Sequence, residues 1–224
     1  MANVTQLKHL EHLEDEMLNY GVEGCMASVN FLKELRKMLG SDNSTGFMQT
    51  KWDGAPSVVC GTDPNSGMFF VGTKSVFAKN SKACYDDVDV DLYYEGDLAE
   101  KLKYSLKYFS TLGIQGIVQG DLLFTTDVKR ETVNGEKLYT FTPNTITYGI
   151  PVDHPIGVAT GKAKIGVVFH THYRGTDFQT MQAVAGAKVK GSIEVLSVDN
   201  DTPMDRVGFC LLYTSDAADE LLGV

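Results

Sequence analysis

The hydrophobic pattern of the chain changes character near residue 46, and this change limits the folds that the chain can adopt. Before it, leucines and methionines recur at steps of three and four across positions 4–39, with acidic side chains between them, as in amphipathic helices. Gly21 interrupts this period and Gly40 follows it, so we expect two consecutive helices that end at Gly40. After residue 46, short apolar runs alternate with turn-forming residues, which indicates strands.

Two hairpins are expected in this second part. The apolar runs 57–60 and 68–71 flank a turn rich in Gly, Asp, Pro and Asn, the composition of a hairpin connection. Asn134-Gly135, between segments rich in Thr, Val and Tyr, predicts a second hairpin. In residues 81–97, acids alternate with apolar side chains, and we expect a solvated loop or an edge strand there.

One helix and two longer strands complete the expected elements. Leucines at every fourth position predict an amphipathic helix over residues 98–112, ending at Gly113. Residues 114–124 and 164–173 are continuous apolar runs, typical of buried strands. No internal repeat or low-complexity linker interrupts them, so the region after residue 46 is expected to form one α+β unit.

The overall charge and hydropathy of the chain exclude some classes of protein. Its 224 residues include 20 Lys and Arg against 29 Asp and Glu, a formal net charge of −9. No apolar run approaches the roughly 20 residues of a membrane-spanning helix, and no secretory signal is visible. We therefore expect a soluble, cytoplasmic protein without a membrane partner. The acidic balance disfavours a surface coated with basic residues for nucleic acid, but leaves room for a local basic groove around a phosphate.

The tetrapeptide Lys51-Trp52-Asp53-Gly54 stands between a polar loop and a strand. A lysine amine in such a place can attack the α-phosphate of a nucleotide and hold the nucleotidyl group as a phosphoramidate. A glycine beside it permits a tight turn and a close approach of the backbone to the nucleotide. The pattern is short, and the structural alternative is a surface turn with an exposed lysine. Trp52 is expected to pack in the core rather than to stack on a nucleotide.

Three further segments make this region resemble the covalent nucleotidyltransferase superfamily, which contains the ATP-dependent RNA and DNA ligases and the mRNA capping enzymes. K-x-D-G is the first motif of that superfamily, and its nucleophile matches Lys51. The run 70–76 is similar to the basic strand that follows, with Lys74 at the phosphate-contacting position. The run 117–123 is similar to the third motif, and 165–170 is similar to the strand after it.

The resemblance implies a fold and a set of residue roles. The fold would be α+β, with two antiparallel sheets around a nucleotide cleft and a two-helix leader before them. Lys51 would be the nucleophile at the floor of that cleft, while Asp53 and Gly54 shape the nucleotide-binding turn. Asp121 would contact the ribose or support the metal, and Phe169 would pack against the purine.

The implied reaction joins ATP to Lys51 as a lysyl-AMP and releases pyrophosphate, with Mg²⁺ neutralising the phosphates. AMP would then pass to the 5′-phosphate end of an RNA or DNA strand. More closely, residues 10–174 resemble a family of uncharacterised proteins encoded by T4-like tailed phages, especially marine and cyanobacterial ones. This second resemblance implies a phage protein that acts in the host cytoplasm.

The domain organisation follows from these resemblances. Residues 1–44 are the expected helical leader and residues 45–209 the nucleotidyltransferase-like domain. Residues 210–224 look like the translation of a transposase-type sequencing adapter, which would make them a non-native tail. The superfamily's Glu-Gly and Lys-x-Lys motifs are not recognisable before Phe209, and we therefore expect the domain to be incomplete.

Two alternatives stay open at this stage. Pro56 stands where ligases commonly have arginine, and Asp121 where they have glutamate, so a non-catalytic nucleotide-binding or virion-associated phage protein that retains the fold is the alternative function. His170 and His172 alternate along one expected strand and would share a face, with Asp53 as a conceivable partner. They are either a polar pair on that strand or two ligands of a metal that needs a third.

Overall fold

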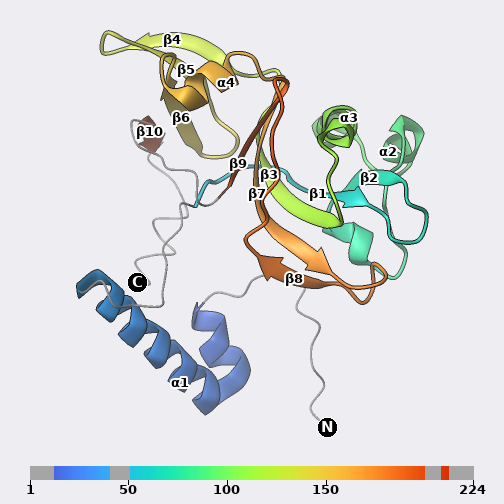
Figure 1. Ribbon diagram of the computed structural model, residues 1–224, viewed down its shortest axis with the longest axis vertical. Coiled ribbons are helices and arrows are strands. Elements are labelled where there is room, and N and C mark those ends of the chain that lie inside the picture. The colour runs from blue at the N-terminus through green and yellow to red at the C-terminus, as the bar shows by residue number, and fades with distance from the viewer. Residues whose placement is uncertain (1–12, 41–50, 200–207, 212–224) are drawn as a thin grey trace. The chain divides into compact units, whose positions relative to one another are not determined.

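The structure is a computed structural model that describes residues 13–40, 51–199 and 208–211 (Figure 1). The chain divides into two compact units, a helical unit over residues 7–49 and a larger unit that begins at Thr50. The predicted loop at residues 41–46 lies outside the described residues, as does the predicted tail except for its first two positions.

The helical unit consists of α1 (Leu13–Gly40), which bends sharply at Gly21. Gly21 has φ 55° and ψ −127°, a backbone conformation that favours glycine, so the predicted break between two helical segments is confirmed. The segments pack closely, because a Cβ atom at Gly24 would lie 1.8 Å from the Glu16 carbonyl oxygen. The Ser28 hydroxyl donates to the Leu13 carbonyl at 3.1 Å across the same contact.

The larger unit is built on a six-stranded sheet in the order β2-β1-β3-β7-β8, in which β9 also pairs with β7. The strands are β1 (Ser57–Thr62), β2 (Phe69–Gly72), β3 (Ile117–Phe124), β7 (Ile165–Arg174), β8 (Gln182–Ala185) and β9 (Val195–Asp199). All pairs are antiparallel except β7 with β9. The predicted first hairpin and both predicted long strands are confirmed as β1–β2, β3 and β7.

Helix α3 covers one side of this sheet. Helix α3 (Gly96–Phe109), continued by the 3₁₀ turn η2 (Ser110–Leu112), contacts β1, β2 and β7 (Figure 1). Its end at Gly113, with φ 63°, confirms the predicted stop. The free thiols Cys60 and Cys84 lie in the core beneath it, and burial raises the pKa of both, so they are packing residues.

The acidic segment after residue 81 is not a loop or an edge strand as predicted. It forms the short helix α2 (Asp87–Tyr93). The Asp86 side chain caps this helix by accepting a hydrogen bond from the Asp89 amide at 2.9 Å. This cap stabilises the helix although the alternating sequence pattern favours a strand. Only Val90 is buried, while Val88 and Leu92 are 76% and 70% exposed.

A second, four-stranded antiparallel sheet has the order β10-β6-β5-β4. It contains β4 (Lys129–Val133), β5 (Glu136–Phe141), β6 (Ile146–Pro151) and β10 (Gly208–Leu211), with helix α4 (Pro155–Thr160) following β6. The predicted Asn134-Gly135 turn joins β4 to β5, both residues having positive φ. Strand β10 includes residues 210 and 211, the first two residues of the predicted non-native tail.

A shared core joins the two sheets. Phe124 and Val168 of the larger sheet pack with Phe141, Tyr148 and Ile150 of the smaller one. The α+β class with antiparallel sheets is therefore confirmed. Within the described ranges, no helix has the length and apolar character needed to cross a bilayer.

Candidate functional site

The K-x-D-G segment lies along β3 rather than in a free loop. The Ala55 amide donates to the Leu122 carbonyl at 2.9 Å, and the Leu122 amide donates to the Pro56 carbonyl at 3.0 Å. Ser57, the first residue of β1, stands opposite Asp121. These bonds extend the β1–β3 ladder backwards and bring the predicted first motif onto the predicted third motif.

Gly54 allows this close approach. A Cβ atom at this position would lie 2.6 Å from the Leu122 carbonyl oxygen and 3.0 Å from the Asp121 Cβ. Both neighbours belong to the rigid part of β3, so a side chain at Gly54 would push the segment away from the strand. The glycine is therefore required by packing against Asp121, whatever else the turn binds.

The other sheet holds the segment through Trp52 and Asp53. The Trp52 ring is 3% exposed and stacks on Tyr148, with ring centroids 5.3 Å apart, which agrees with the packing role expected for it. The Tyr148 hydroxyl accepts from the Asp53 amide at 2.7 Å and donates to the Asp53 carbonyl at 3.1 Å. Asn144 donates to the Asp53 carboxylate at 3.4 Å. Burial is the main cause that raises the pKa of Tyr148, so this hydroxyl stays a donor at neutral pH.

Lys51 itself is exposed, in contrast to the enclosed position expected for it. It forms no ion pair within the described part of the chain. Its backbone leads directly into the fixed Trp52–Asp53 segment, so the root of the side chain is anchored while its amine lies in solvent. An incoming ligand therefore meets an accessible lysine at the edge of the site.

Asp121 is paired with His170 across β3 and β7. The His170 Nε2 atom lies 3.5 Å from Asp121 Oδ1, and the two side chains are 22% and 24% exposed. The register of the strands shifts between Gln119 and Gly120, where Thr171 and Phe169 are the respective partners. His170 is thus the extra residue of a β-bulge, a feature that re-aims side chains.

The same register separates His170 from His172. His172 stands opposite Val118, whose side chain belongs to the core beneath α3, whereas His170 contacts Asp121. The prediction that the two histidines share a face is therefore wrong, because the bulge changes the alternation between them. Among the described residues, no group of three or more His, Cys, Asp or Glu side chains is placed to hold a metal ion.

Phe169 lies on the side of the sheet away from Asp121, and Lys74 lies on the turn that follows β2. Phe169 is 1% exposed and packs edge-on against Phe109 of α3, with centroids 5.7 Å apart. It therefore lies on the helix-covered side of the sheet, opposite to the side on which Asp121 and His170 meet. Lys74 is exposed, and it begins the 3₁₀ turn η1 (Lys74–Phe77) after β2 has ended at Gly72, so the predicted basic strand is shorter than expected.

Two contributors to the site were missed by sequence reasoning. Tyr148 lies in β6 and Asn144 lies just before it, 95 and 91 residues from Asp53 in the sequence. No local sequence pattern distinguishes them as site residues. Tyrosine is common in strands, so the sequence alone suggests only a packing role for Tyr148. Its hydrogen bonds to Asp53 become visible only when the two sheets are placed together.

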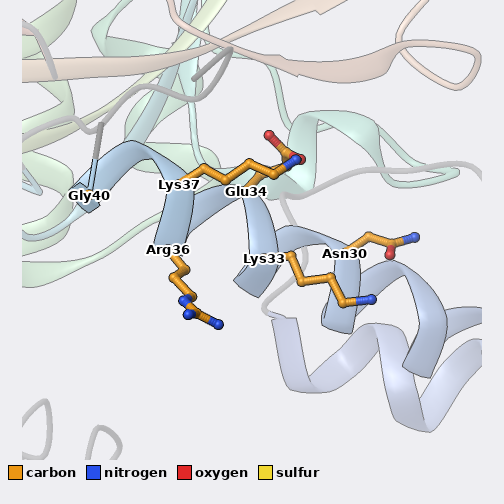
Figure 2. Close-up of a pocket in the computed structure, with 6 residues that line it drawn as sticks. All are labelled: Asn30, Lys33, Glu34, Arg36, Lys37 and Gly40. Carbon is orange, nitrogen blue, oxygen red and sulfur yellow. The ribbon is translucent and has the colours of Figure 1, made fainter. Parts of the chain in front are cut away.

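A separate hollow lies on the helical unit. It has a volume of about 620 Å³ and is lined by Asn30, Lys33, Glu34, Arg36, Lys37 and Gly40 of α1 (Figure 2). Lys37 pairs with Glu34 at 2.6 Å within one helical turn. The described residues that line this hollow all belong to α1, and none of them is a predicted site residue.

Comparison with known proteins adds a family but no described activity. No curated protein and no solved structure matches the chain. Residues 3–219 match a family described as a family of unknown function (DUF6267), and this match spans nearly the whole sequence. The chain therefore belongs to this family of unknown function, DUF6267.

Proposed function

We propose that the protein is a covalent nucleotidyltransferase of the ligase type, with Lys51 as the nucleophile. The Lys51 amine attacks the α-phosphorus of ATP, a P–N bond forms, and the bond to the pyrophosphate oxygen breaks. Pyrophosphate leaves, and the ammonium proton passes to solvent. AMP is then transferred to the 5′-phosphate of an RNA or DNA strand.

The observation that carries the proposal is the convergence of the motif segments on adjacent strands. K-x-D-G leads into β1, and the other three segments include β2, β3 and β7, which are neighbours in the order β2-β1-β3-β7. Segments more than 100 residues apart in the sequence thus meet in one sheet. The four matching segments therefore lie on neighbouring strands, as a shared nucleotide site requires.

Asp121 is the residue that fits a divalent cation. Mg²⁺ in nucleotide sites is usually held by one or two carboxylates together with phosphates and water, so a single half-buried carboxylate beside Gly54 is an adequate donor. Bound there, Mg²⁺ would neutralise charge on the phosphates. His170 positions the Asp121 carboxylate, and exposed Lys74 remains the proposed phosphate contact from the neighbouring strand connection.

The test is retention of label on the denatured protein. The chain is incubated with ATP labelled on the α-phosphate and with Mg²⁺, then denatured and separated by electrophoresis. We expect label on the wild type and none on Lys51→Ala or Lys51→Arg, since neither side chain forms the phosphoramidate. Lys82→Arg, a change at another exposed lysine, is the matched control and retains the label.

Asp121→Asn tests the cation role in the same assay. Removing the carboxylate charge should lower the yield of adduct at least about tenfold and raise the Mg²⁺ concentration needed for half-maximal yield. A wild-type chain that retains no label with Mg²⁺ or Mn²⁺ overturns the transfer reaction.

The second candidate is a nucleotide-binding or virion-associated protein that keeps the fold without transfer. It is favoured by the exposure of Lys51 and by the burial of Phe169 against Phe109, which leave the amine unenclosed and the aromatic ring covered. This candidate predicts reversible ATP binding in equilibrium dialysis, no covalent label, and the same affinity in Lys51→Arg.

A further inference from the structure

A cavity on the larger unit is lined, among the residues that the structure describes, by three cations and by no Asp or Glu. It has a volume of about 350 Å³ and is bounded by the β3–β4 turn, β4, β5, the end of α4 and one residue of α3. Its basic residues are Lys129, Arg130 and Lys164, all exposed. In a chain with a formal charge of −9, a cavity whose described lining residues include three cations and no Asp or Glu is a local reversal of charge.

Two of the three cations of this cavity have no acidic partner within the part of the chain that the structure describes. Arg130 and Lys164 have no carboxylate within ion-pair distance there, and the Arg130 guanidinium lies 6.0 Å from the centroid of the Tyr139 ring. Lys129 also lines an adjoining cavity together with Asp127 and Glu131, so acidic side chains lie near its positive charge. Arg130 and Lys164 therefore carry the unmet positive charge.

Aromatic and hydroxyl groups complete the cavity wall. Tyr104 and Tyr139 are half-buried and line it together with Thr125, Thr126 and Thr160. Gly161 leaves room for the Tyr139 ring, since a Cβ atom there would lie 2.4 Å from the tyrosine hydroxyl.

We propose that this cavity binds the phosphodiester backbone of a single-stranded nucleic acid. Arginine and lysine contact phosphates, and tyrosine rings offer stacking surfaces to bases without selecting among them. The small volume suits one or two nucleotides of a flexible strand rather than a duplex. The choice of a polynucleotide as occupant rests on the proposed ligase-type function, but binding needs neither ATP nor Lys51.

The test measures binding without ATP, so that failure of strand binding and failure of transfer are separate results. Fluorescein-labelled 12-mers of uridine RNA and thymidine DNA are titrated with the full chain at several salt concentrations, with anisotropy as the readout. We expect Arg130→Gln/Lys164→Gln to raise the Kd about tenfold or more. The salt slope should also fall by about 1.4, since each single-strand phosphate contact contributes about 0.7.

The controls isolate the cavity from general charge. Lys162→Gln removes an exposed lysine two positions from Lys164 that does not line the cavity, and we expect wild-type binding. Arg130→Lys/Lys164→Arg keeps the charges and should restore most of the affinity. Equal binding by wild type and the double glutamine variant overturns the proposal, as does equal loss in Lys162→Gln. Binding of a fluorescent mononucleotide through the same residues without oligonucleotide binding also overturns it.

Discussion

The Tyr148 hydroxyl bridges both backbone groups of Asp53, accepting from its amide at 2.7 Å and donating to its carbonyl at 3.1 Å. The two residues are 95 positions apart in the sequence, and they belong to different layers of the larger unit. The contact ties the smaller sheet to the turn that begins with Lys51. The orientation of that turn therefore depends on a side chain that no part of the K-x-D-G pattern specifies.

Tyr148→Phe should loosen the turn while keeping the ring stack on Trp52. The change removes one acceptor and one donor from a half-buried backbone, at a cost of about 1–3 kcal/mol in the free energy of unfolding. Denaturant titration measures this loss, and covalent labelling should fall with it. Tyr93→Phe, at a 37% exposed tyrosine, is the control and should leave stability unchanged. Equal stability of Tyr148→Phe and wild type would contradict the bridging role.

Gly54→Ala should displace the turn from β3. The added Cβ atom would meet backbone at 2.6 Å, and backbone cannot rotate aside as a flexible side chain can, so we expect a loss of about 1–3 kcal/mol. Gly40→Ala is the matched control, because nothing lies within 4 Å of its added atom. Thermal unfolding of both variants checks the contrast. If Gly54→Ala unfolds at the wild-type temperature, Gly54 does not lie in close contact with Asp121 in solution.

Local signals predicted the elements well where one short segment decides the outcome. The break at Gly21, the stop at Gly113 and the Asn134-Gly135 turn all follow from positive φ angles, which few residues other than glycine and asparagine tolerate. The buried strands followed from continuous apolar runs. In residues 81–97 the alternating pattern predicted a loop or an edge strand, but a helix forms. The Asp86 side chain caps the N-terminus of this helix and so stabilises it.

The arrangement of the site depended on long-range register, and the sequence holds little information about it. A strict period of two would put His170 and His172 on one face, but one extra residue at the bulge separates them. The same register places Phe169 opposite Gly120, with its ring beneath α3. The motif letters carry no information about this register, so the side of the sheet on which the Phe169 ring lies could not be predicted from them.

Phe169→Ala distinguishes a core residue from a base-packing one. Because the ring is 1% exposed and packs against Phe109, we expect a loss of about 3–5 kcal/mol in the free energy of unfolding. Phe31→Ala, at a 57% exposed phenylalanine, should change stability by less than about 0.5 kcal/mol. Denaturant unfolding of the two variants gives the comparison. Weaker ATP binding by Phe169→Ala with unchanged stability would assign the ring to the nucleotide instead.

The pH dependence of stability should reveal the buried Tyr173, whose hydroxyl donates to Gln119. Burial raises the pKa of Tyr173 to about 12, whereas tyrosine in an unfolded chain titrates near 10. Between these values the unfolded chain holds fewer protons than the folded one, so stability falls as the pH rises. The contribution is complete below about pH 10 and is lost progressively towards pH 12.

Tyr173→Phe should therefore be less stable than wild type at neutral pH, because Gln119 loses its donor, yet show a shallower decline above about pH 10. Tyr85, whose pKa burial also raises to about 12, keeps part of the decline in this variant. Urea unfolding at a series of pH values measures both effects. Tyr93→Phe should keep the full wild-type slope. If the stability of Tyr173→Phe and that of wild type fall in parallel as the pH rises, the Tyr173 hydroxyl is exposed to solvent. Its contact with Gln119 is then not buried.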